Sequence, residues 1–89
     1  MIEKTIVVKN KSGLHARPAS FLVKEAARFQ SSLSLGKGGR EVDLKSILGV
    51  MSLAVMSGET VSIKADGVDE AEALEHLIDA FENGLGEDA

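Results

Sequence analysis

The sequence contains no cysteine, tryptophan or tyrosine, and its aromatic residues are three phenylalanines. Without cysteine, the chain can form neither a disulfide framework nor a metal site built on sulfur, and two isolated histidines do not make a metal site. Few aromatic side chains and scattered basic residues make nucleic acid a poor candidate for direct binding. The glycine-rich stretch 36–39 lacks the spacing of a nucleotide-binding loop, so no cofactor is expected.

Long apolar segments are also missing. The longest near-apolar run, residues 47–56, falls well short of the roughly 18–20 residues that cross a bilayer. The first residues reach Lys9 too soon to form the apolar stretch of a signal peptide. We therefore expect a cytoplasmic protein without membrane insertion.

Basic residues are absent from the C-terminal segment 66–89, which contains nine acidic residues. The preceding 65 residues contain all ten lysines and arginines and five acidic residues. This asymmetry indicates a positive working face that meets acidic partners or phosphate. The length of 89 residues predicts a single domain, residues 1–89.

Hydrophobic periodicity predicts strands and helices in the order βαββαβα. The expected strands cover residues 1–9, the two arms of a hairpin around the glycine-rich turn 36–39, and residues 61–65. The expected helices cover residues 15–29, residues 47–53, and a last helix whose apolar stripe runs from 74 to 85. Two-layer α+β packing follows, with the helices covering one face of a small sheet.

Four residues near the helix ends, and one histidine within the last helix, carry further expectations. Ser46 is expected to be the N-cap of the short helix. Asp69 and Glu72 have the spacing of a capping box, and Gly84 suits a helix C-cap. His76 falls off the apolar stripe of the last helix and is expected to be exposed to solvent.

The segment 13–19 (GLHARPA) is the part of the chain that local structure explains least well. It places His15 at a helix N-terminus, where unpaired N–H groups and the helix dipole disfavour an imidazolium and favour an anion. A neutral imidazole has a lone pair free to attack phosphorus, and Arg17 can hold phosphate oxygens at any working pH. These residues predict a phosphoryl acceptor. The alternative is an incidental surface histidine beside a solvated arginine.

Residues 13–19 resemble the active-site signature of the HPr family, the phosphocarriers of the bacterial phosphoenolpyruvate:sugar phosphotransferase system. Residues 42–55 (VDLKSILGVMSLAV) resemble the second signature of the family, around its regulatory serine. Both segments lie at the expected distance from the N-terminus, and the chain length and element order also match. The resemblance implies an open-faced β-sandwich, in which three helices cover one face of a four-stranded antiparallel sheet.

The resemblance also implies a role for each residue of the first segment. His15 would accept a phosphoryl group through Nδ1 from phosphorylated enzyme I and pass it to enzyme IIA domains. The guanidinium of Arg17 would stabilise the phosphohistidine, with the backbone amides of Ala16 and Arg17 as further donors. The chain would be a stoichiometric carrier and not an enzyme.

Ser46 has a structural interpretation as an N-cap and a regulatory one. In Gram-positive-type HPr proteins, the serine at this position is phosphorylated by the ATP-dependent HPr kinase/phosphorylase, and the modified form interacts with the catabolite control transcription factor. Phosphorylation places about −1.5 to −2 charges at a helix N-terminus, which the helix dipole tolerates. The two roles of Ser46 are compatible.

The short helix is too short to bury every face, so part of its apolar surface is expected to dock partners. Val50 and Leu53 can point to the core, whereas Ile47, Leu48 and Met51 form a different face. An apolar stripe is more often core than interface, but the resemblance places this patch in partner docking. The expected docking residues are Ser12, Leu14, Ser20, Lys24, Ile47, Leu48 and Met51.

Three function classes therefore compete. The first is a phosphoryl carrier that uses His15, and the second is a regulatory module that acts mainly through Ser46 in carbon catabolite control. The third is an interaction domain with an incidental motif. A monomer is expected, although an N-terminal strand joined by a loop can exchange between chains.

Overall fold

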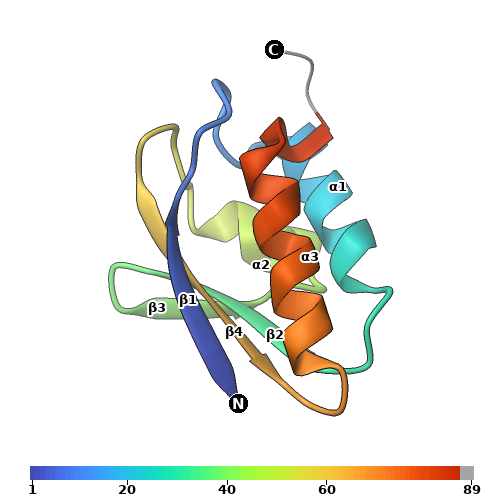
Figure 1. Ribbon diagram of the computed structural model, residues 1–89. Helices are drawn as coiled ribbons and strands as arrows, with labels where there is room; N and C mark the ends of the chain where they lie inside the picture. Colours follow the sequence, from blue (N-terminus) through green and yellow to red (C-terminus); the bar gives the residue numbers. More distant parts are fainter. Residues whose placement is uncertain (87–89) are drawn as a thin grey trace.

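The computed structural model describes residues 1–86, in which an antiparallel sheet lies against a layer of helices (Figure 1). The elements follow in the order β1 (Ile2–Val7), α1 (Ala16–Ala26), β2 (Ser32–Lys37), β3 (Arg40–Asp43), α2 (Ile47–Ser52), β4 (Thr60–Asp66) and α3 (Glu70–Glu82). A 3₁₀ turn over Gly84–Gly86 follows α3. The predicted βαββαβα order and the open-faced α+β sandwich are both confirmed.

The four strands pair in the order β1-β4-β2-β3, and every pairing is antiparallel. The central strand β4 turns Val61, Ile63 and Ala65 toward the helices, and all three side chains are buried. The predicted glycine-rich hairpin turn is confirmed at Gly38 and Gly39. Their φ angles of 57° and 84° lie in the left-handed region that a two-residue hairpin loop favours.

The core lies between the sheet and the two longer helices, which pack side by side (Figure 1). Helix α1 contributes Ala19, Leu22 and Ala26, and α3 contributes Leu77 and Phe81; these side chains are almost fully buried. No helix within residues 1–86 is long and apolar enough to cross a membrane.

Helix α1 is shorter than its periodicity predicted. It ends at Ala26, because the next backbone bonds run from Arg28 N to Glu25 O and from Phe29 N to Ala26 O, in the i to i+3 pattern of a tightened last turn. Phe29 still packs against the core from this turn.

The predicted capping box at the start of α3 is wrong. Asp69 is the N-cap residue, but its side chain makes no capping bond. Its carboxylate instead accepts hydrogen bonds from the N–H of Gln30 at 2.9 Å and from the N–H and hydroxyl of Ser31. These bonds hold the pKa of Asp69 below its usual range, and the bond from the Ser31 hydroxyl has the largest effect. Asp69 therefore joins the start of α3 to the loop between α1 and β2.

His76 is half-buried, not exposed as predicted. Its Nε2 atom lies 2.6 Å from Oε1 of Glu25 on α1, and its ring lies against Phe29 with a centroid separation of 5.3 Å. Arg28 contacts the same carboxylate oxygen at 3.0 Å. His76 and Arg28 hold the pKa of Glu25 below its usual range, and the hydrogen bond from His76 has the larger effect.

The C-cap residue of α3 is Asn83, one residue before Gly84, the predicted cap. Helix α3 ends at Glu82, and Gly84 follows with a φ of 80°, the left-handed conformation common after a helix end. Leu85 then turns back and is fully buried, although it lies beyond the helix and has a φ of 55°. The apolar stripe predicted from 74 to 85 therefore lies mostly on α3, and its last residue, Leu85, lies on the turn that follows the helix.

Candidate phosphoryl-acceptor site

His15 is the N-cap residue of α1, with an extended backbone (φ −86°, ψ −167°) and an exposed side chain. Its carbonyl oxygen accepts the first helical hydrogen bond from Ala19 N at 2.9 Å. Pro18 has no N–H, so Ala16 and Arg17 supply the donors of this first turn. Both residues are exposed. The histidine therefore stands where a helix concentrates outward-facing amides and partial positive charge.

The loop that leads into His15 lies against the backbone that follows α2. Gly13 has a φ of 65°, and a Cβ at this position would lie 2.5 Å from the carbonyl oxygen of Val55. The next residue, Leu14, donates its N–H to the same oxygen at 2.9 Å. Asn10 closes the loop by donating from Nδ2 to the Gly13 carbonyl at 2.6 Å. Glycine is thus required at position 13 by both backbone conformation and space.

Leu14 corrects one of the docking expectations. Its side chain is 2% exposed and belongs to the hydrophobic core, so it offers almost no surface to a partner. Its contribution is structural: the buried side chain and the backbone bond to Val55 fix the residue immediately before His15.

The charges at the N-terminal end of α1 favour an anion. The first turn contains no acidic residue, and Arg17 is exposed within it. Ser20 and Lys24, also exposed, follow Arg17 at a spacing that shares one helix face. Ser12 is exposed on the preceding loop. Within residues 1–86, no group of three or more His, Asp or Glu side chains is placed to hold a metal ion.

Ser46 is the N-cap of α2, as predicted. Its Oγ atom accepts a hydrogen bond from Gly49 N at 3.1 Å, which satisfies one of the free donors at the helix start. Helix α2 packs against α1, the helix that begins beside His15. The serine hydroxyl therefore caps α2, and a phosphate on the same oxygen would change this capping hydrogen bond.

Helix α2 and its C-cap residue Leu53 divide their apolar side chains between the core and solvent, as predicted. Val50 and Leu53 are buried, whereas Ile47, Leu48 and Met51 are 42%, 81% and 39% exposed. An exposed cluster of large apolar side chains on one short helix is typical of an interaction site. We call these three residues the α2 patch.

Sequence reasoning missed the residues that support the His15 loop. The chain after α2 turns at Ala54, whose φ of 51° is unusual for a residue with a Cβ. Lys37 and Glu59 hold this turn from β2 and from the loop before β4. No motif or periodicity marks either residue. The contacts of Lys37 join positions 16 to 22 residues apart, and Glu59 reaches the turn through the N–H of Met56.

Comparison with known proteins agrees with this geometry. Residues 2–83 match a family model described as the PTS HPr component phosphorylation site. The chain is 46% identical to the phosphocarrier protein HPr of Xylella fastidiosa strain 9a5c, over 99% of both chains. It is 51% identical to the HPr-like protein Crh of Halalkalibacterium halodurans, over 88% of this chain and 93% of the relative.

Solved structures give the same result. The crystal structure of HPr-C-His from Thermoanaerobacter tengcongensis superposes with a TM-score of 0.95, covers 100% of both chains and is 46% identical. An HPr dimer from the same organism superposes with a TM-score of 0.78 over 98% of this chain and 100% of the other. On these matches, which span nearly the whole chain, it belongs to the HPr family of phosphocarrier proteins of the phosphotransferase system.

Proposed function

We propose that this chain carries a phosphoryl group on His15 and passes it between proteins in the cytoplasm. The observation that supports this most is the position of His15 at the start of α1, beside the amides of Ala16 and Arg17 and the exposed Arg17 guanidinium. The donor is phosphorylated enzyme I, charged in turn from phosphoenolpyruvate. The acceptors are enzyme IIA domains that serve sugar uptake.

The transfer needs a nucleophile and a site for negative charge. The lone pair on Nδ1 of His15 attacks phosphorus, and a P–N bond forms as the bond to the donor breaks. The guanidinium of Arg17 and the first-turn amides then hydrogen-bond to the phosphoryl oxygens. In the second transfer, a nucleophile of the next acceptor attacks phosphorus as the P–N bond breaks, and neutral His15 is regenerated. The chain is therefore a carrier and not an enzyme.

Partners dock on the surface around His15. The α2 patch supplies apolar contact area, and Arg17 and Lys24 supply positive charge that suits acidic partners. Ser12 and Ser20 are exposed at the edge of the same region and add polar contacts.

Ser46 supplies regulation in this proposal. An HPr kinase/phosphorylase transfers phosphate from ATP to Ser46 Oγ, and the modified chain binds the catabolite control transcription factor. The added phosphate lies next in sequence to Ile47 and Leu48, so it changes the charge of the docking surface.

A second candidate function is regulation through Ser46 without phosphoryl transport. It is supported by the 51% identity to the HPr-like protein Crh and by the exposed α2 patch next to Ser46. The presence of His15 favours the carrier function.

The test is intact mass spectrometry after incubation with enzyme I and phosphoenolpyruvate, with a His15→Ala variant as control. We expect one added phosphoryl group that disappears after brief acid treatment and is absent from the variant. No addition to the folded wild-type chain would contradict the carrier function. An acid-stable phosphate on Ser46 after treatment with HPr kinase and ATP would then favour the regulatory one.

We propose that the working form is a monomer, because the four strands already pair within one chain. Light scattering over a range of protein concentrations tests this. A concentration-dependent dimer would indicate that strands exchange between copies.

A further inference from the structure

The residues before His15 rest on four residues that follow α2, and we call residues 53–56 the support segment. Leu14 N donates to the carbonyl of Val55 at 2.9 Å. Gly13 approaches so closely that a Cβ would lie 2.8 Å from the Met56 Cα. A shift of the support segment therefore moves the backbone that leads directly into His15.

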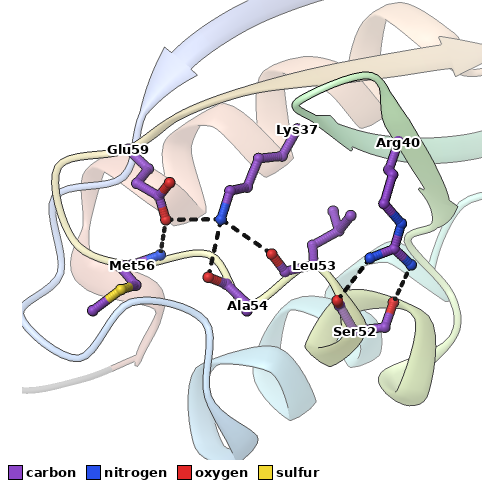
Figure 2. A network of polar contacts seen from close by, with 7 residues as sticks. All are labelled: Lys37, Arg40, Ser52, Leu53, Ala54, Met56 and Glu59. Carbon is purple, nitrogen blue, oxygen red and sulfur yellow. Dashed lines mark hydrogen bonds and ion pairs between the residues drawn. The ribbon is translucent and has the colours of Figure 1, made fainter.

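Lys37 binds the support segment from the end of β2 (Figure 2). Its ammonium group donates to the carbonyl oxygens of Leu53 and Ala54, both at 3.1 Å, and to Oε1 of Glu59 at 2.9 Å. The same Glu59 oxygen accepts the N–H of Met56 at 2.7 Å. Lys37 thus holds the start of the support segment, and Glu59 holds its end.

The support segment needs these contacts because it combines an unfavourable backbone conformation with carbonyl oxygens that have no partner within α2. Ala54 has a φ of 51°, a conformation that costs an L-residue roughly 1–2 kcal/mol. The carbonyls of Leu53 and Ala54 follow the end of α2, where a helix leaves acceptors unsatisfied. The Lys37 side chain is about one-quarter exposed, and its bond to the Leu53 carbonyl is partly buried, whereas its bond to the Ala54 carbonyl is exposed.

We propose that Lys37 and Glu59 are positioning residues for His15, which act by fixing the support segment on which Gly13 and Leu14 lie. This inference rests on the proposed phosphoryl-carrier function. Neither residue touches the transferred group. Loss of their contacts lets the support segment relax, so that the imidazole no longer meets phosphorus in line within the docked complex.

Arg40 provides a matched control on the other side of the same hairpin turn. It donates from one guanidinium nitrogen to the Ser52 carbonyl at 3.0 Å and from the other to Ser52 Oγ at 3.3 Å (Figure 2). These bonds hold the last turn of α2 and make no contact with the support segment. Removal of Arg40 therefore breaks a similar set of hydrogen bonds between the hairpin and α2. It leaves the backbone that contacts Gly13 unchanged.

The experiment compares Lys37→Met with Arg40→Met as substrates of phosphorylated enzyme I. For Lys37→Met we expect kcat to fall about tenfold, because the imidazole of His15 loses its orientation toward phosphorus. KM should stay within twofold of wild type, because the α2 patch is unchanged. For Arg40→Met we expect both constants within twofold of wild type. Equal kcat values for the two variants would overturn the proposal.

Amide hydrogen exchange gives a readout that does not depend on enzyme I. The Leu14 N–H, bonded to Val55, should exchange about tenfold faster in Lys37→Met than in wild type, while the Ala19 N–H inside α1 stays protected. Arg40→Met should leave the Leu14 rate within twofold of wild type. An unchanged Leu14 rate in Lys37→Met would contradict the proposal, even if the wild-type chain proves not to accept phosphate.

A second variant covers the case in which Lys37→Met does not fold. Glu59→Gln keeps the shape of the side chain and removes the charge that attracts Lys37, so it should change kcat and Leu14 exchange in the same direction and by less. Wild-type values for both measurements would overturn the proposal. Failure of wild type itself to gain an acid-labile phosphate would instead contradict the carrier function.

Discussion

Gly13 and Val55 lie in backbone contact, with 2.5 Å between the Val55 carbonyl oxygen and the place that a Cβ on Gly13 would occupy. The contact joins two segments 42 residues apart in sequence, one that leads into His15 and one that follows α2. The position of His15 therefore depends on a close approach of two chain segments that only glycine allows.

Gly13→Ala is expected to destabilise the fold and slow phosphoryl transfer. The new methyl group collides with backbone atoms, and an L-residue with φ near 65° costs a further 1–2 kcal/mol, roughly. We expect a loss of about 2–4 kcal/mol in urea unfolding and a fall in the rate of His15 phosphorylation under folded conditions.

Gly84→Ala is the matched control for that change. Gly84 also has a positive φ, of 80°, but a Cβ there would meet no atom within 4 Å. Gly84→Ala should lose only the roughly 1–2 kcal/mol of stability that the left-handed conformation costs, and it should keep the wild-type transfer rate. A similar loss of rate in both variants would mean that lowered stability, and not displacement of the His15 loop, is the cause.

Ser46→Ala is expected to lower stability by about 1 kcal/mol, because Gly49 N loses its capping acceptor. Thermal unfolding of a domain this size should then show a melting temperature about 4–8 °C lower. Ser46→Asn keeps a capping acceptor and should stay near wild type while it removes the hydroxyl. Equal melting temperatures for Ser46→Ala and wild type would show that the cap contributes little.

Met51→Glu tests the α2 patch as a docking surface. A charge on this exposed side chain removes apolar contact area and repels acidic partners, so KM for enzyme I should rise about tenfold with little change in stability. Val68→Glu is the control, because Val68 is an exposed apolar residue on the loop between β4 and α3. Wild-type kinetics for Met51→Glu would remove Met51 from the interface.

Local sequence patterns predicted the features that depend on local physics. Alternating apolar residues marked β4, and Ser46 followed by an apolar run marked the start of α2. The opposite faces of α2 also followed from spacing alone, because Val50 and Met51 necessarily point in different directions on a helix.

The errors arose where tertiary contacts outweighed local preference. Asp69 had a local partner available at the helix start, yet its carboxylate binds Ser31, 38 residues away. Leu14 stood alone between Gly13 and His15, with no periodicity to mark it as core. His76 lay off the apolar stripe of α3, but α1 and α3 pack side by side, and its ring meets Glu25 across that contact.

The contact between Glu25 and His76 predicts how stability depends on pH. Hydrogen bonds from His76 and Arg28 lower the pKa of Glu25 in the folded chain below its value of 4.5 in the unfolded chain. Its contribution is therefore fully present above pH 4.5 and is lost as the pH falls through the lower folded value. Glu25→Gln should be about 1 kcal/mol less stable than wild type at pH 6, and the difference should shrink toward pH 3. Urea unfolding at both pH values measures it, and a difference that stays constant would contradict the assignment to Glu25.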